Sequence, residues 1–436
     1  MLLLVVVLLG ITSTSAMFYR ECVENVASFP VVCCPMYNGS VCGSALNRGS
    51  CMPVVNSRTI SPPDVHIDDR HLFPIHYYSY TCQCKDNFFG DNCGQCDYNR
   101  YGDNCEKLNN VTRKDIRELS ETARHQYFAQ LHQCKYKIDP DYVILVSGDR
   151  FRRIAYIFQN ASYYDVWCYI HNYVTRQFIN NTRENNLLNF GHGSTGFLTF
   201  HRMYMLGLER SMQRCTKDPN FALMYYDWRS EPECTICQDD FLGGNDAHGR
   251  LNGVNVFSSW RSICVEYYLT GTNCLMSTCE CERPKIIRNP GATPGLTIPT
   301  KQDVDYCLSL PVLDGNTYTS TATRSFRNCV EGFRNRFENP DTSMHNRFHL
   351  YCGGSMTIVA ISCNDPMFIF HHTFIDKIFN IYIVSRNLSP SSYPPNPIYG
   401  HQPTDCILPF LPCRQHRRMV VPISNFGVTY SFYKEF

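Results

Sequence analysis

The cysteines constrain this chain more than any other feature, because ten of its 25 lie between Cys22 and Cys105. So many cysteines would be a liability in a reducing cytosol, and they favour an oxidising compartment. An even number within about ninety residues predicts up to five disulfides, which would hold a small module that lacks a large core. Cys93 and Cys96 could bind zinc instead, but no histidine lies at the spacing of a zinc finger.

The N-terminus fits the same compartment. An apolar run from Leu2 to Gly10 is followed by small polar residues that end at Ala16. The run is too short to span a bilayer, so residues 1–16 are interpreted as a signal peptide. No later stretch reaches eighteen apolar residues, so no transmembrane helix is expected. Five Asn-x-Ser/Thr sequons predict glycosylation in the secretory pathway: Asn38, Asn110, Asn160, Asn180 and Asn387.

The composition excludes several classes of protein. Among 436 residues, 40 are Lys or Arg and 39 are Asp or Glu, so the chain is nearly neutral and offers no basic block for nucleic acid. With 44% hydrophobic residues it is not a disordered chain. We expect a cysteine-rich module over residues 17–106 and a larger domain over residues 107–436. The segment from Cys82 to Cys105 resembles epidermal-growth-factor and laminin-type modules.

Beyond the cysteine-rich segment the sequence predicts a mainly α fold with long loops. Apolar residues recur at helical spacing in four stretches: Tyr164–Gln177, Gly196–Gln213, Ser325–Asn335 and Asp365–Arg386. Between them lie loops rich in proline and glycine, notably Arg283–Thr300 and Ser389–Pro403.

Seven of the fifteen histidines fall in two windows. In the second window, His345 and His349 are four residues apart, so on a helix both rings lie on one face and can bind one ion. His371 and His372 follow in an almost entirely apolar flank. Adjacent helical residues point about 100° apart, so only one of these two can easily join the pair, and spacing does not say which.

The first window has the same form. His171 and His201 each lie on an apolar helical stripe, and His192 lies in a glycine-flanked loop between them. Burying charged imidazoles together would be costly, whereas a metal ion satisfies several neutral rings at once. Two histidine triads without a clear carboxylate or thiolate ligand favour copper or zinc over calcium or magnesium. With copper, the natural bridging molecule is dioxygen; with zinc it would be water or hydroxide.

These residues resemble the tyrosinases, which are type-3 binuclear copper oxidases, and the resemblance extends over nearly the whole chain. The segments that carry it are His171, Gly191–Arg202, Tyr226–Arg229, Ser343–His349 and Asn364–Asp376. The resemblance implies a four-helix core around two copper ions. It implies one ion held by His171, His192 and His201, and another held by His345, His349 and His372.

The resemblance also implies roles for residues around the metals. Glu331 matches a carboxylate that orients a water, and Asn346 matches an asparagine that helps this water deprotonate a phenol. Val359 and Ser362 match positions at the substrate entrance. The remaining neighbours are expected to support the ligands from outside: Arg202 and Asp376 as an ion pair that ties the two copper halves together, and His371 beside His372.

The implied reaction uses dioxygen to convert phenols, in this family L-tyrosine and L-dopa, into o-quinones for melanin synthesis. The implied location is the melanosome lumen, or secretion, since the sequence ends without a membrane anchor. Members usually carry proline where this chain has Thr195 and Thr199, and tryptophan where it has Phe200. Proline pre-sets the backbone, so the loop that holds His192 is expected to be less rigid here.

Three other interpretations remain open. A tyrosinase-related protein could hold zinc in the same histidine frame and isomerise dopachrome or oxidise weakly. A haemocyanin-type oxygen carrier would need a shielded copper pair and large assemblies. A secreted cysteine-rich binding protein with a decayed site would keep the fold without the chemistry. The odd number of cysteines predicts at least one unpaired thiol within the chain.

Overall fold

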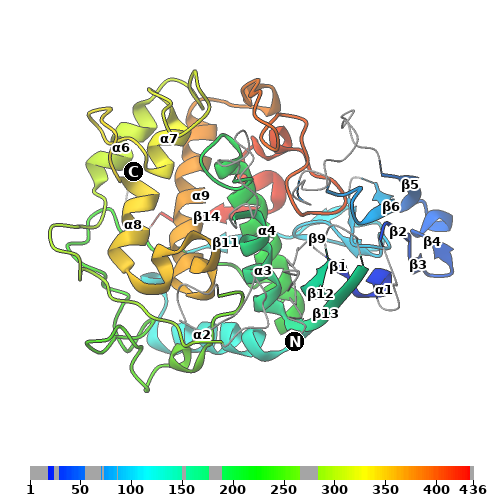
Figure 1. The fold of residues 1–436 in the computed structure, drawn as a ribbon, viewed down its shortest axis with the longest axis horizontal. Coiled ribbons are helices and arrows are strands. Elements are labelled where there is room, and N and C mark those ends of the chain that lie inside the picture. Colours follow the sequence, from blue (N-terminus) through cyan, green and yellow to red (C-terminus); the bar gives the residue numbers. More distant parts are fainter. Residues whose placement is uncertain are drawn as a thin grey trace, which may run out of the picture.

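The computed structural model describes residues 18–23, 29–54, 70, 73–85, 87–149, 154–175, 189–265 and 283–432. The expected signal peptide and the sequon at Asn180 lie outside these residues. Helices dominate the larger part of the chain, as predicted, and short strands dominate the cysteine-rich part (Figure 1). The helices are α1 (Arg20–Val23), α2 (Glu121–Tyr136), α3 (Tyr163–Thr175), α4 (Gly196–Thr216), α6 (Lys301–Ser309), α7 (Phe326–Glu331), α8 (Met344–Cys352) and α9 (Met367–Ser385).

The cysteine-rich segment contains small sheets joined by disulfides. β5 (Gly49–Pro53) pairs antiparallel with β6 (Tyr78–Cys84), and β2 (Val31–Cys33) pairs parallel on the other side of β6. The hairpins are β3 (Met36–Tyr37) with β4 (Ser40–Val41), β7 (Phe88–Phe89) with β8 (Gln95–Cys96), and β9 (Arg100–Tyr101) with β10 (Lys107–Leu108).

The ten cysteines of this segment form five disulfides, which confirms the prediction. The pairs are Cys22–Cys33, Cys34–Cys51, Cys42–Cys82, Cys84–Cys93 and Cys96–Cys105. Because Cys93 and Cys96 are both cross-linked, the alternative of a zinc site on these two residues is wrong. The unpaired thiols of the described residues are Cys168, Cys352 and Cys363, and all three are buried.

A long β-hairpin was not among the predicted elements. β12 (Ile138–Asp149) pairs with β13 (Ile154–Ser162), and β1 (Phe18–Tyr19) adds a third strand along β12. β13 leads directly into α3, so the hairpin fixes where that helix begins. A second long-range pairing joins β11 (Val111–Arg113) to β14 (Val428–Tyr430) in parallel.

The helix predicted over Ser325–Asn335 is shorter than expected. α7 ends at Glu331, and Gly332 follows with φ of +101°. A Cβ at Gly332 would lie 1.9 Å from the carbonyl oxygen of Ser343, so only glycine fits where the chain turns toward α8. The early end of α7 brings Glu331 next to the start of α8.

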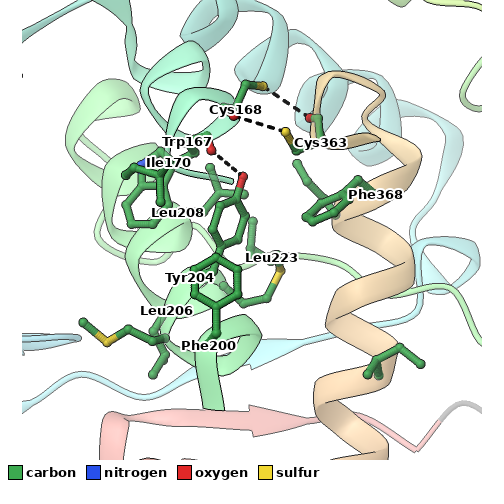
Figure 2. Close-up of a cluster of buried hydrophobic side chains, with 14 of the residues drawn as sticks. Trp167, Cys168, Ile170, Phe200, Tyr204, Leu206, Leu208, Leu223, Cys363 and Phe368 are labelled. Carbon is green, nitrogen blue, oxygen red and sulfur yellow. Dashed lines mark hydrogen bonds between the residues drawn. The ribbon is translucent and has the colours of Figure 1, made fainter. Parts of the chain in front are cut away.

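The core lies between α3, α4 and α9. In Figure 1, α4 and α9 run side by side through the centre of the larger part. Figure 2 shows Trp167 of α3, Tyr204 of α4 and Phe368 of α9 converging, and the Tyr204 hydroxyl donates to the carbonyl oxygen of Trp167 at 2.9 Å. The Cys168 and Cys363 thiols each donate to the other residue's carbonyl oxygen at 3.4 Å, which joins α3 to the segment before α9. The packing of these rings and the hydrogen bonds beside them hold α3, α4 and α9 together, and these helices carry four of the histidines.

Candidate metal centre

The structure gathers the seven histidines of the two windows into two clusters, in each of which the candidate ligand atoms lie within 4.8 Å of one another. The first cluster contains His171 from α3, His192 from the following loop and His201 from α4. The second cluster contains His345 and His349 from α8, with His371 and His372 from α9.

In the second cluster three ring nitrogens converge. The Nε2 atom of His372 lies 3.2 Å from Nε2 of His345 and 3.1 Å from Nε2 of His349. The Nδ1 atom of His349 contacts the carbonyl oxygen of Met356 at 2.8 Å, and Nδ1 of His345 contacts Oδ1 of Asn346 at 3.0 Å. These oxygens accept hydrogen bonds, so the ring protons belong on Nδ1 and the Nε2 lone pairs of His345 and His349 face inward.

His371 has a different environment. Its ring stacks on Phe348 with centroids 4.4 Å apart, and its Nδ1 atom accepts a hydrogen bond from Nε1 of Trp228 at 3.2 Å. Because that Nδ1 atom accepts, the neutral His371 ring carries its proton on Nε2. Within the described part of the chain, neither Nε2 of His371 nor Nδ1 of His372 has a hydrogen-bond partner.

The first cluster shows the same chemistry with fewer partners. Nδ1 of His201 contacts the carbonyl oxygen of Phe197 at 2.8 Å, which leaves its Nε2 atom buried and unpaired within the described residues. Both ring nitrogens of His171 are likewise unpaired there. His192 is half-buried, and its Nδ1 lies 3.3 Å from Oδ1 of Asn189.

Burial keeps these rings neutral. It lowers the pKa of His201 to about 3 and that of His349 to about 4, against an ordinary value of 6.5. It also holds the pKa values of His171, His192, His345 and His372 well below that value, with neighbouring histidines adding to the effect. Neutral imidazole nitrogens that converge with buried lone pairs need a cation, so the donor set fits copper or zinc. The clusters face each other, because the rings of His201 and His372 stack with centroids 4.3 Å apart.

Glu331 contacts the segment that carries His192 and also His345, and Asn346 contacts His345. The Glu331 carboxylate is fully buried, and its Oε1 accepts a hydrogen bond from the Gly193 amide at 2.5 Å, one residue from His192. Its Oε2 accepts from Nη1 of Arg327 at 3.1 Å. Burial raises the pKa of Glu331 to about 7, although the nearby Arg327 acts in the opposite direction. The half-buried Asn346 projects from α8 beside His345.

The two residues matched to the substrate entrance differ in exposure. Val359 is 45% exposed, whereas Ser362 is 1% exposed and its hydroxyl donates to the carbonyl oxygen of Val359 at 3.1 Å. The described geometry therefore puts Val359 at the surface and Ser362 beneath it.

Arg202 and Asp376 form a buried ion pair that joins α4 to α9, with Nε and Oδ1 2.6 Å apart. Asp376 also pairs with Arg113 of β11 at 3.1 Å, and Arg113 pairs with Glu209 at 2.8 Å. Arg113 and Glu209 were not among the predicted site residues, because nothing in their local spacing marks them. Neither were Asp314 and Arg327, which lie behind Glu331.

The asparagines of the four sequons that lie within the described residues are all exposed: Asn38, Asn110, Asn160 and Asn387. Among the described residues, no helix combines the length and the apolar character that a membrane span requires.

Residues 161–384 match the family model described as the common central domain of tyrosinase. The tyrosinase of Felis catus is 33% identical over 95% of this chain and 81% of its own length. The 5,6-dihydroxyindole-2-carboxylic acid oxidase of Gallus gallus is 32% identical over 95% of this chain and 82% of its own length.

Among solved structures, a polyphenol oxidase mutant from Thermothelomyces thermophila aligns with a TM-score of 0.50 at 15% identity. The alignment covers 77% of this chain and 91% of that one, and at this identity it shows the fold alone. Together with the matched central domain and the identity to curated tyrosinases, the two facing histidine clusters establish that this chain belongs to the tyrosinase family of copper-dependent phenol oxidases.

Proposed function

We propose that the chain binds two copper ions and converts monophenols and catechols to o-quinones with dioxygen. His171, His192 and His201 hold one ion, and His345, His349 and His372 hold the other. The observation that carries the proposal is that the buried Nε2 atom of His372 lies within 3.2 Å of Nε2 of both His345 and His349, with oxygens on the Nδ1 side of the latter two. Copper supplies dioxygen binding and the electron transfer, which the side chains alone cannot provide.

Within the second cluster we assign His372 as the ligand and His371 as its neighbour. The Nε2 atom of His372 contacts both other histidines of the triad, whereas Nδ1 of His371 is engaged by Trp228. The stack on Phe348 fixes the orientation of the His371 ring. His371 therefore packs the ligands from outside the triad.

The protein provides the proton acceptor and the position of the ring. Glu331 is buried beside both clusters with a pKa raised to about 7, so it can take the phenol proton through a water near neutral pH. Asn346 fixes the orientation of His345 through Oδ1, which leaves its amide protons to bind that water. The exposed Val359 borders the entrance, and Ser362 holds the Val359 backbone.

The stoichiometry defines the assay. One monophenol and one dioxygen give one o-quinone and one water; two catechols and one dioxygen give two o-quinones and two waters. We propose L-tyrosine and L-dopa as substrates, melanin synthesis as the role, and the melanosome lumen or the extracellular space as the location. We further propose that residues 17–106 form a cysteine-rich module in front of the catalytic domain over residues 107–436, and that the five sequons are glycosylated.

A second candidate is a related activity in the same frame. The dihydroxyindole-carboxylic acid oxidase of Gallus gallus matches this chain at nearly the same sequence identity as the tyrosinases. Oxidation of a dihydroxyindole-carboxylic acid is therefore the alternative to oxidation of tyrosine and dopa. Zinc in the same triads would give dopachrome isomerisation without oxygen uptake.

The test combines metal analysis with oxygen uptake. We expect purified protein to hold two copper ions and to consume oxygen with both a monophenol and a catechol. Zinc with isomerase activity would select the alternative, and oxygen uptake with dihydroxyindole-carboxylic acid alone would select the other oxidase. Protein without bound metal and without turnover would contradict the proposed function.

A further inference from the structure

Residues 189–195, which carry His192 and lead into α4, are held at two points after His192. At the first point, the Glu331 carboxylate binds the amide of Gly193, directly after His192. At the second, the hydroxyl of Thr195 donates to Oδ2 of Asp314 at 2.6 Å. Residues 189–195 hold no regular secondary structure, so these two bonds, together with the contact between Nδ1 of His192 and Oδ1 of Asn189, fix how the segment presents His192.

The Thr195 hydroxyl is engaged both as a donor and as an acceptor. Besides donating to Asp314, its Oγ1 accepts from Nδ2 of Asn396 at 2.9 Å, and the same amide donates to Oγ of Ser194 at 2.9 Å. Thr195 is 1% exposed and Asp314 is 8% exposed, so water cannot readily replace these bonds.

Asp314 is connected back to the first point. Arg327 grips it with two nitrogens, Nε to Oδ2 at 3.0 Å and Nη2 to Oδ1 at 2.9 Å. The third nitrogen, Nη1, donates to Oε2 of Glu331 at 3.1 Å. The chain of bonds runs from Thr195 through Asp314, Arg327 and Glu331 to Gly193, so both of its ends lie on the His192 loop. A carboxylate bound in two places by one arginine has little freedom to move.

The same network touches the second cluster. The main-chain oxygen of Glu331 lies 3.3 Å from Nδ1 of His345. Glu331 thus contacts the first cluster's loop through its side chain and the second cluster through its backbone. Thr195 contacts neither His345 nor Glu331 directly and is linked to the second cluster through Asp314, Arg327 and Glu331, so we expect a change at Thr195 to act more strongly on the first cluster.

We propose that Thr195 and Asp314 are positioning residues that hold His192 on the metal of the first cluster. The inference rests on the proposed function. In it, the hydrogen bonds of the Thr195 hydroxyl restrict the backbone at a position where a proline ring would otherwise do so. Outer partners of metal ligands are worth about 10- to 100-fold in metal affinity, which sets the expected size of the effect.

The test compares Thr195→Val, which keeps the shape and loses the hydroxyl, with Thr195→Ser, which keeps it. Copper-loaded protein is exposed to a chelator, and native mass spectrometry counts the ions that remain. We expect Thr195→Val to lose one ion about tenfold faster than the wild type and to keep the other, with Thr195→Ser close to the wild type. Thr216→Val, at the far end of α4, removes a hydroxyl that bonds within its own turn and serves as the control.

Hydrogen exchange over residues 189–196 of the metal-free protein gives a second readout that needs no activity. We expect faster exchange there in Thr195→Val, with the α8 amides unchanged. If Thr195→Val does not fold, Asp314→Asn is measured in its place, with the same expectation. Wild-type retention of both ions and unchanged exchange would overturn the inference, as would equal loss of both ions. Wild-type protein that binds no metal would contradict the proposed function, and the exchange result would still decide this inference.

Discussion

The two histidine clusters present the same ligands on very different supports. The second cluster takes two of its members from a single helix turn, His345 and His349 of α8, and two more, His371 and His372, from the buried helix α9. The first cluster takes His192 from a loop, between His171 on α3 and His201 on α4. α8 places the rings of His345 and His349 on one face, where Oδ1 of Asn346 and the carbonyl oxygen of Met356 accept from their Nδ1 atoms, whereas the loop depends on hydrogen bonds from distant segments. The second cluster is therefore the more rigid support, and the first is where substitutions outside the triad act most strongly.

The largest effect is expected from removing a ligand of the rigid cluster. His349→Ala should bring oxygen uptake with catechols to background, a loss beyond the about 100-fold that follows removal of an outer partner. The metal content should fall from two ions to one, as measured by mass spectrometry. Full oxidase activity in this variant would exclude His349 from the ligand set.

The neighbouring pair on α9 gives the next largest contrast. His372→Gln should lose the second ion, whereas His371→Gln should keep it, because an amide oxygen can still accept from Nε1 of Trp228. We expect less than about a 100-fold loss of metal affinity for His371→Gln. If His371→Gln lost the second ion and His372→Gln kept it, His371 would be the ligand and His372 its neighbour.

The tie between the clusters should show in stability. Arg202→Met leaves the buried Asp376 with Arg113 as its remaining ion partner, and breaking a buried pair costs about 3–5 kcal/mol. We expect Arg202→Met to lower the free energy of unfolding by about 3 kcal/mol, as measured by unfolding in urea. Lys301→Met, which breaks the exposed pair with Asp305, should cost at most about 0.5 kcal/mol. Equal costs for the two variants would show that the buried pair contributes nothing beyond a surface pair.

The most gradual effect is a pH dependence near the first cluster's loop. Nε2 of His416 donates to the carbonyl oxygen of Gly400, so its Nδ1 atom accepts from the hydroxyl of Thr199. Burial lowers the pKa of His416 to about 3 and the pKa of His401 to about 4. A lowered pKa in the folded state means that the unfolded chain binds more protons below pH 6.5. The contribution of these two rings to the free energy of unfolding should therefore be fully present above pH 6.5. It should fall by up to about 1.4 kcal/mol per pH unit for each ring as the pH drops toward 4. His416→Gln should reduce that slope in urea unfolding between pH 7 and pH 5, and an unchanged slope would exclude His416 as a contributor.

Much of the candidate site was visible in the sequence because it follows helical spacing. His345 and His349 lie four apart, and His171 and His201 lie on apolar stripes, so their burial could be anticipated. The choice between His371 and His372 could not, since it depends on Trp228, which lies more than a hundred residues away in the chain. The resemblance, not the spacing, pointed to His372.

The support of the loop was invisible for the same physical reason. Thr195 and Asp314 are 119 residues apart, and no periodic pattern connects them. The replacement of proline by Thr195 predicted a looser loop, but the structure shows that its hydroxyl is bonded to Asp314 and Asn396. The β12–β13 hairpin was missed because short apolar runs such as Tyr142–Val146 suit a strand or a buried helix equally well.

Anomalous diffraction at the copper edge from crystals of copper-loaded protein would show the metals and their ligands together. We expect two peaks, one inside the triad of His171, His192 and His201 and one inside the triad of His345, His349 and His372, with His371 turned away toward Trp228. A single peak, no peak, or a peak bound by His371 in place of His372 would contradict the assignment of two three-histidine copper sites.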